Sequence, residues 1–164
     1  MRLRPATPDD LELLRRWDVQ PHIVAAKSDD DWSWEVELAR RPDWREQLIA
    51  EVGGRPVGFV QIIDPAREDG HYWGDVPANL RAVDLWLGEA ADLGKGYGTA
   101  VMRLALERCF ADPEVEAVLV DPLAVNTRAH RFYEPGRAPA FRRRRLLRLP
   151  PRSDRPLHLQ YFSP

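Results

Sequence analysis

A glycine-rich turn between a strand-like and a helix-like segment constrains the fold most strongly. Residues 91–101 read ADLGKGYGTAV, with Gly94, Gly96 and Gly98 on alternate positions. The segment before the turn, RAVDLWLGE, alternates like a strand, and the segment after it has helical apolar spacing. Such a unit presents backbone N–H groups at the positive end of a helix dipole, which favours a phosphate or pyrophosphate. The turn therefore predicts a phosphorylated cofactor.

Two common phosphate-binding motifs do not fit the spacing of this turn. A Walker A loop would need Ser or Thr directly after Lys95, but Gly96 follows it. A dinucleotide fingerprint would need a glycine where Thr99 stands and an early βαβ unit, and the chain has neither. A glycine-rich helix entry that binds no ligand remains open as an alternative.

The rest of the chain alternates between helical and extended patterns. We predict strands at 1–6, 45–52, 56–64, 81–89 and 116–124, weaker strands at 141–149 and 157–162, and helices at 8–19, 32–40, from the glycines to before Pro113, and at 126–134. The acidic run SDDDW is expected at the start of the second helix. This order predicts one α/β domain over 1–164, with a mixed sheet and helices on both faces. Cys109 is expected to be buried on the apolar face of the glycine helix.

Charge is unevenly distributed, although the net charge is only −2. Residues 128–164 hold ten arginines against Glu134 and Asp154, so the preceding part of the chain is acidic. An acidic body attracts a cationic ligand, but a solvated surface would give the same count. The basic tail lacks interleaved aromatic residues and any nucleic-acid motif, so we expect no nucleic-acid partner.

Other partner classes are disfavoured by what the sequence does not contain. No window approaches the roughly 20 apolar residues that span a bilayer, and the N-terminus lacks the apolar core of a signal peptide. We therefore expect no membrane partner and a cytoplasmic location. The four histidines are far apart in sequence and no Cys or His cluster occurs, so we expect no metal site.

Two segments carry a family resemblance. LGKGYGTAVMRLAL at 93–106 resembles the acetyl-CoA-binding signature of the GNAT superfamily of N-acetyltransferases, and DPLAVNTRAHRFYE at 121–134 resembles the segment that follows it. Within the superfamily, LGKGYGT, FADPEV and VDPLAVNTRAHRFYE resemble the aminoglycoside 6'-N-acetyltransferases. The resemblance implies a GNAT-like sheet that is mostly antiparallel and splayed between its fourth and fifth strands. It also implies acetyl-CoA as the cofactor.

The same resemblance implies where acetyl-CoA binds. The loop amides from Gly94 to Thr99 would hold the pyrophosphate, and the strand from Leu85 to Leu87 would bind the pantetheine arm. The cofactor-binding residues implied in this way are Leu85, Trp86, Leu87, Gly94, Lys95, Gly96, Tyr97, Gly98, Thr99 and Asn126.

The chain departs from the family pattern at two places. Leu93 stands where the pattern begins with Arg or Gln, which leaves the amide donors of the loop in place. FYEPGRAPAF at 132–141 is longer than the family's turn after FYE and has two extra prolines. A change of reading frame near residue 134 would also produce the Arg- and Pro-rich tail.

Acetylation of an amine needs one group that takes a proton from the ammonium and another that protonates the departing thiolate. Asp84 lies in an apolar strand, where a charge is costly without a partner, and the resemblance places it at the proposed base position. The alternative is that Asp84 is an ordinary outward-facing residue of an alternating strand. Tyr133 matches the family's tyrosine that protonates the thiolate, with a packed core tyrosine as the alternative. A backbone N–H between Leu85 and Leu87 is the simplest oxyanion donor.

Acidic and aromatic residues are candidates for acceptor binding, because carboxylates bind ammonium groups and flat rings lie against sugar faces. The candidates are Asp69, Tyr72, Trp73, Asp75 and Asp121. Asp121 is the strongest, since it ends an apolar run at the mouth of the sheet.

These features together predict an acetyl-CoA-dependent N-acetyltransferase that acts on a primary amine of a polycationic small molecule. The resemblance implies the 6'-amine of an aminoglycoside antibiotic as the acceptor, with antibiotic resistance as the outcome. We expect a monomer or a homodimer. A protein N-terminal or lysine acetyltransferase is the alternative enzyme. A non-catalytic acyl-CoA-binding module is the alternative outside catalysis.

Overall fold

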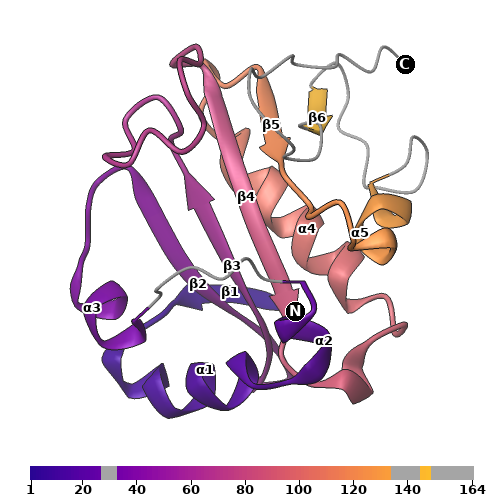
Figure 1. Cartoon of the computed structure of the whole chain (residues 1–164). Helices are drawn as coiled ribbons and strands as arrows, with labels where there is room; N and C mark the ends of the chain where they lie inside the picture. Colours follow the sequence, from indigo (N-terminus) through magenta and orange to yellow (C-terminus); the bar gives the residue numbers. More distant parts are fainter. Residues whose placement is uncertain (27–32, 134–144, 149–164) are drawn as a thin grey trace.

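The computed structural model describes residues 1–26 and 33–133, and the backbone of 145–148 (Figure 1). The elements in chain order are β1 (Arg2–Pro5), η1 (Pro8–Asp10), α1 (Leu11–Asp18), α2 (Pro21–Val24), α3 (Trp34–Ala39), β2 (Arg45–Val52), β3 (Arg55–Ile63), β4 (Leu80–Leu87), η2 (Ala90–Asp92), α4 (Tyr97–Cys109), β5 (Ala117–Val120), α5 (Thr127–Phe132) and β6 (Arg145–Arg148). The two η elements are single turns of 3-10 helix.

The described strands form one sheet in chain order from β1 to β6. The pairs from β1 to β4 are antiparallel, whereas β5 runs parallel to β4 and β6 runs parallel to β5. β4 pairs with β5 only from Leu80 to Ala82, so residues 83–87 extend beyond the pairing. Figure 1 shows β5 beside only the upper part of β4. The predicted mixed sheet, splayed between its fourth and fifth strands, is confirmed.

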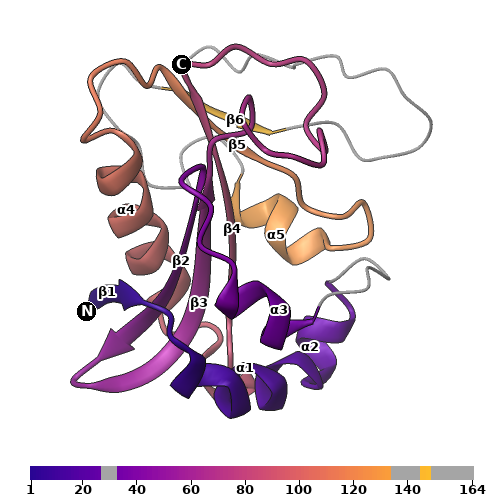
Figure 2. The same ribbon diagram turned by 90° about the vertical axis from the view of Figure 1, so that its left-hand side faces the viewer.

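Alternation along β2 and β3 explains why both faces of the sheet are covered. Leu48 and Val60 point to the face under α4, whereas Ile49 and Phe59 point to the other face, under α1 and α3. Because successive side chains of a strand point to opposite faces, two apolar neighbours supply two separate cores. Figure 2 shows α4 on one side of the sheet and α2, α3 and α5 on the other.

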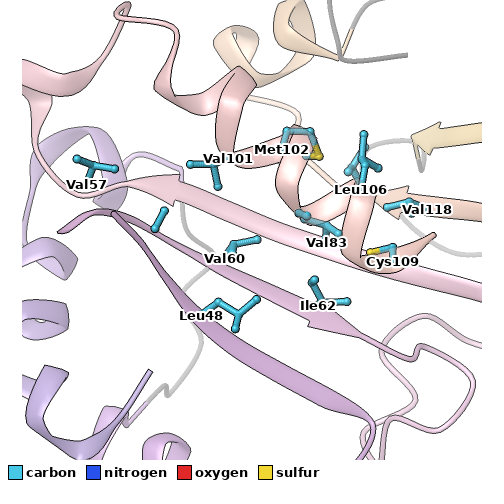
Figure 3. Packing of buried hydrophobic residues seen from close by; sticks show 13 residues of the cluster. Leu48, Val57, Val60, Ile62, Val83, Val101, Met102, Leu106, Cys109 and Val118 are labelled. Atoms are coloured by element: carbon cyan, nitrogen blue, oxygen red, sulfur yellow. The ribbon is translucent and has the colours of Figure 1, made fainter. Parts of the chain in front are cut away.

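The core under α4 is built from the apolar face that the sequence predicts. Met102, Leu106 and Cys109 pack against Val60 and Val83 of the sheet (Figure 3). Cys109 is 3% exposed, which confirms its predicted burial. Burial raises the pKa of its thiol to about 12, so the thiol stays protonated at neutral pH.

Several predicted boundaries differ from the structure. The helix predicted at 8–19 is a 3-10 turn followed by α1, and α2 was not predicted. The strand predicted at 116–124 ends at Val120. The strand predicted at 141–149 is found in part as β6, and the strand predicted at 157–162 and the acidic run SDDDW lie outside the described residues. No helix in the described part of the chain is long and apolar enough to cross a membrane.

Candidate active site

A cavity of about 890 Å³ lies where β4 and β5 diverge. Its walls come from the second half of β4, the glycine loop, α5, α2 and the loop between β3 and β4. Of the predicted site residues, those that line it are Tyr72, Trp73, Asp84, Leu85, Trp86, Leu87, Gly94, Gly96, Gly98, Thr99, Asp121, Asn126 and Tyr133. The fold therefore brings one side of the predicted cofactor site together with both predicted catalytic residues.

The glycine loop adopts a conformation that requires glycine. Gly94 and Gly96 have φ angles of 78° and 80°, in the left-handed region, and Gly96 is the N-cap of α4. A Cβ added at Gly94, Gly96 or Gly98 would meet nothing within 4 Å, so the loop borders open space. Its amides lie at the N-terminus of a helix of 13 residues, which suits an anion.

Two predicted cofactor residues of this loop do not line the cavity. The Lys95 ammonium is half-exposed and lies 3.6 Å from Oδ1 of Asp92. Tyr97 is partly buried and packs against the core under α4. On the other wall, the Asn126 side chain accepts a hydrogen bond of 3.0 Å from the Ala129 N–H and so begins α5, as predicted.

Asp84 lies on β4 in register with Gln61 on β3. The Gln61 side-chain amide donates a long hydrogen bond of 3.5 Å to Oδ2 of Asp84. Burial raises the pKa of Asp84 to about 6, an effect that the Gln61 hydrogen bond opposes and the negative charge of Asp121 increases. Among the described residues no Arg or Lys pairs with this carboxylate. Asp84 therefore has the properties of a base that titrates near neutral pH.

Tyr133 follows α5 and faces the same cavity as Asp84. Burial raises the pKa of its phenol above the usual range, and the charge of Asp84 raises it further. The phenol therefore stays protonated at neutral pH and is a proton donor. Its ring packs edge-on against Phe132, with centroids 5.0 Å apart, which holds its position.

Most of the acceptor candidates lie on the loop between β3 and β4. The conformation of this loop places some of them at the cavity and others in solvent. The Tyr72 hydroxyl donates a hydrogen bond of 2.9 Å to Oδ2 of Asp121, and its ring lies 5.2 Å from that of Trp73 in an edge-on contact. Trp73 is 2% exposed, so it supports the wall of the cavity and presents little ring surface. Asp69 and Asp75 are exposed and do not line the cavity, and Asp69 lies 3.5 Å from Arg40.

Other polar residues line the cavity that sequence reasoning did not select, namely Asp18, His22, Arg45, Gln61, Glu68 and Arg128. Gln61 could have been found, because it is a lone polar residue in an apolar strand, as Asp84 is. His22 could not, since it comes from the unpredicted α2, where its Nε2 lies 2.8 Å from the carbonyl oxygen of Leu87. Within 1–26 and 33–133, no cluster of three or more His, Cys, Asp or Glu could hold a metal.

A sheet that splits beside a helix-capping glycine loop, with a buried carboxyl and a protonated phenol in the gap, is the arrangement expected of an acyl-transfer enzyme. The model of the acetyltransferase (GNAT) domain matches residues 6–145. The chain therefore belongs to the GNAT acetyltransferase family. The predicted superfamily, the enzyme class and acetyl-CoA as the cofactor are confirmed.

Particular members of the family are also similar to this chain. Aminoglycoside N(6')-acetyltransferase type 1 of Klebsiella pneumoniae is 33% identical over 146 residues, which cover 80% of this chain and 70% of the relative. The structure of AAC(6')-Ib with paromomycin and acetyl-CoA has a TM-score of 0.69 at 32% identity, covering 80% of this chain and 78% of that one. The structure of the same enzyme with coenzyme A and kanamycin has a TM-score of 0.68 at 32% identity, covering 80% of each chain.

Proposed function

We propose that this chain transfers an acetyl group from acetyl-CoA to the 6'-amine of an aminoglycoside antibiotic. The observation that carries the proposal is the 33% identity, over 80% of the chain, to an aminoglycoside N(6')-acetyltransferase. The cavity supports it, because Asp84 and Asp121 are close enough for the charge of one to raise the pKa of the other. Two coupled carboxylates favour an acceptor with several ammonium groups, since each is stabilised by a nearby positive charge.

The glycine loop and β4 fit acetyl-CoA. The loop borders open space and presents its amides at the start of α4, where the dipole and N–H donors suit the phosphates. β4 extends beyond its pairing with β5 from Val83 to Leu87, so its edge can accompany an extended pantetheine arm. When bound there, acetyl-CoA supplies the acetyl group as an activated thioester.

Residues of the cavity then accept and donate the protons of the transfer. A carboxyl of Asp84 takes the proton of the reacting ammonium, and its pKa of about 6 makes it a stronger base than an ordinary aspartate while it stays mostly ionised at pH 7. The Tyr133 hydroxyl, protonated at neutral pH, gives a proton to the leaving sulfur. A backbone N–H between Leu85 and Leu87 stabilises the oxyanion.

Asp121 and Tyr72 hold the acceptor. The Tyr72 hydroxyl donates to Oδ2 of Asp121, which fixes the carboxylate just after the end of β5, where its negative charge attracts an ammonium of the acceptor. Asp18 and Glu68 also line the cavity, so further ammonium groups of a polycation meet acidic side chains. The buried Arg45 is neutralised by Glu37, at 2.5 Å, and so does not oppose a cationic acceptor.

A matched pair of aminoglycosides tests the proposal, one with an amine and one with a hydroxyl at the 6' position and otherwise identical. Thiol release from acetyl-CoA is measured with each, and we expect acetylation of the 6'-amine compound alone. Equal release with both compounds would contradict 6' transfer. Linear polyamines and peptides with free N-termini or lysines complete the panel, and a preference for peptides would favour the protein acetyltransferase.

A cellular measurement addresses the predicted role in resistance. Expression of the chain in an aminoglycoside-susceptible bacterium should raise the inhibitory concentration of the 6'-amine compound and leave that of the 6'-hydroxyl compound unchanged.

Binding of acetyl-CoA without transfer to any compound in the panel would favour the non-catalytic module.

A further inference from the structure

A buried carboxylate stands directly before the glycine loop. Asp92 is the last residue of η2 and is 2% exposed. Nη1 and Nη2 of Arg55 donate to its two oxygens at 2.7 and 2.9 Å. Arg55 is the first residue of β3, so this two-pronged contact joins the β2–β3 hairpin to the start of the loop.

The two side chains of the pair differ in exposure, and Asp92 depends on Arg55 for a partner to its buried charge. The Asp92 side chain is almost fully hidden, whereas the Arg55 side chain is about half exposed and covers it. The hydrogen bonds from Arg55 are the main reason that the pKa of Asp92 is held below its usual range. A buried carboxylate that loses its partner is unfavourable, so without Arg55 the start of the loop would move toward solvent.

Asp92 contacts the loop at a second point as well. The ammonium of Lys95, in the middle of the loop, lies 3.6 Å from Oδ1 of the same carboxylate. Gly94 lies between Asp92 and Lys95 in the sequence, and Gly96 follows Lys95. Both glycines have φ angles in the left-handed region. Glycines have the largest conformational freedom in the unbound chain, so a loop built on them needs external contacts to stay in one conformation.

Neither member of the pair belongs to a core cluster or lines the cavity. Loss of the pair should therefore affect the order of the loop far more than the packing of the domain. Lys95, in turn, lies near Asp92 and does not line the cavity, so the structure places its ammonium with this carboxylate and not on the cavity wall.

We propose that Arg55 and Asp92 are positioning residues that hold the glycine loop in its phosphate-binding conformation before acetyl-CoA arrives. The inference rests on the proposed function only in that the loop binds acetyl-CoA. Preorganisation of this kind raises affinity because the ordering of the loop is completed before binding. The pair acts through the loop amides and touches neither substrate.

The first measurement needs no catalysis. Hydrogen exchange of the unliganded protein should be at least about fivefold faster over residues 93–99 in Arg55→Gln and Asp92→Asn, with unchanged exchange in the sheet. The dissociation constant of acetyl-CoA, measured without an acceptor, should rise about tenfold in both variants. The double variant should bind about as weakly as Asp92→Asn alone, because Arg55→Gln has no Arg55–Asp92 contact left to remove once the carboxylate is gone.

Steady-state kinetics separate positioning from a general loss of structure. We expect KM for acetyl-CoA to rise, with kcat at saturation and KM for the acceptor within about twofold of the parent. Arg55→Lys should restore part of the affinity, since one donor remains. Arg108→Gln is the matched control, because Arg108 pairs with Glu46 at 2.6 Å on the last turn of α4, away from the loop.

Unchanged acetyl-CoA affinity and loop exchange in a folded Arg55→Gln variant would overturn the inference. Equal losses in every kinetic constant, matched by a large drop in thermal stability, would also overturn it in favour of a structural role. A parent protein that binds acetyl-CoA but acetylates no aminoglycoside would refute the proposed function alone, because loop exchange and cofactor affinity would still test the pair.

Discussion

Replacing Asp84 by Asn should stabilise the folded protein at neutral pH while it removes turnover. Burial raises the pKa of this carboxyl from 3.8 to about 6. The folded protein therefore binds this proton more tightly than the unfolded chain does, so stability falls as pH rises from about 4 through 6. Above pH 6 the folded state carries the full cost of an ionised carboxylate in the cavity. The asparagine amide has the same shape but no charge, so the variant avoids this cost.

The size of the effect follows from the two pKa values. Each pKa unit corresponds to about 1.4 kcal/mol, so the upper limit is about 3 kcal/mol at pH 7.5. Asp84 keeps partial contact with solvent, and the variant loses the carboxylate's attraction for the Gln61 amide, so we expect about 1 to 2 kcal/mol. For a chain of this length that corresponds to a Tm increase of roughly 2 to 8 °C. At pH 5 the stabilisation should be roughly half as large, because the parent carboxyl is then mostly protonated.

The assay is thermal unfolding of parent and variant at pH 7.5, 6 and 5, combined with kcat at saturating substrates. The variant should lose at least about 10²-fold in kcat while its affinity for acetyl-CoA is unchanged. Glu107→Gln is a control for the exchange of carboxylate for amide on an exposed helix face. A variant that is less stable than the parent at pH 7.5 would refute the argument from burial, and full turnover would remove Asp84 as the base.

Two further substitutions test the candidate site, and a third tests the packing of the domain. Asp121→Asn should move the acidic limb of the pH–rate profile to lower pH, because a negative charge that raises the pKa of the base is removed; an unmoved limb would contradict this coupling. Gly96→Asp should weaken acetyl-CoA binding by at least about tenfold, since it puts a charge and a strained backbone, at a φ of 80°, beside the phosphates; calorimetry tests this in a protein whose Tm confirms folding. Gly88→Ala should lower the free energy of unfolding by about 1–3 kcal/mol or more, because its Cβ would lie 1.9 Å from the buried ring of Trp17; denaturant unfolding measures this, and a neutral result would refute the clash.

Local patterns predicted the central part of the fold, where each element carries its own signal. The alternation in β2, β3 and β4 depends only on neighbours in sequence, and so does the helical spacing in α4. Both patterns can therefore be recognised without knowledge of tertiary contacts. α2 has four residues, of which only Ile23 is buried, so it has no period to detect. The end of β5 was placed too late because apolar residues resume after Asp121, from Pro122 to Ala124, although the pairing of β5 with β4 and β6 does not go beyond Val120.

The candidate site was predictable where a residue is unusual for its element. Asp84 interrupts an apolar strand and the glycines interrupt a strand–helix junction, and the structure places both at one cavity. The loop before β4 was harder, because its composition does not say which side chains face inward. Gly74 and His71 have φ angles of 70° and 48°, and these turns direct Tyr72 and Trp73 to the cavity, with Asp75 outside it.

In the proposed mechanism Asp121 binds the acceptor and Asp84 is the base, and the coupling of their charges has a measurable consequence. In the free enzyme the charge of Asp121 helps to raise the pKa of Asp84 to about 6. The additional ammonium groups of a bound polycation act in the opposite direction, because a nearby positive charge favours the ionised carboxylate. The acidic limb of kcat/KM, which reports the free enzyme, should therefore lie near pH 6, whereas that of kcat should lie at lower pH. Coincident limbs, or a higher limb in kcat, would show that the acceptor brings no further positive charge to the base and would favour an acceptor with a single amine.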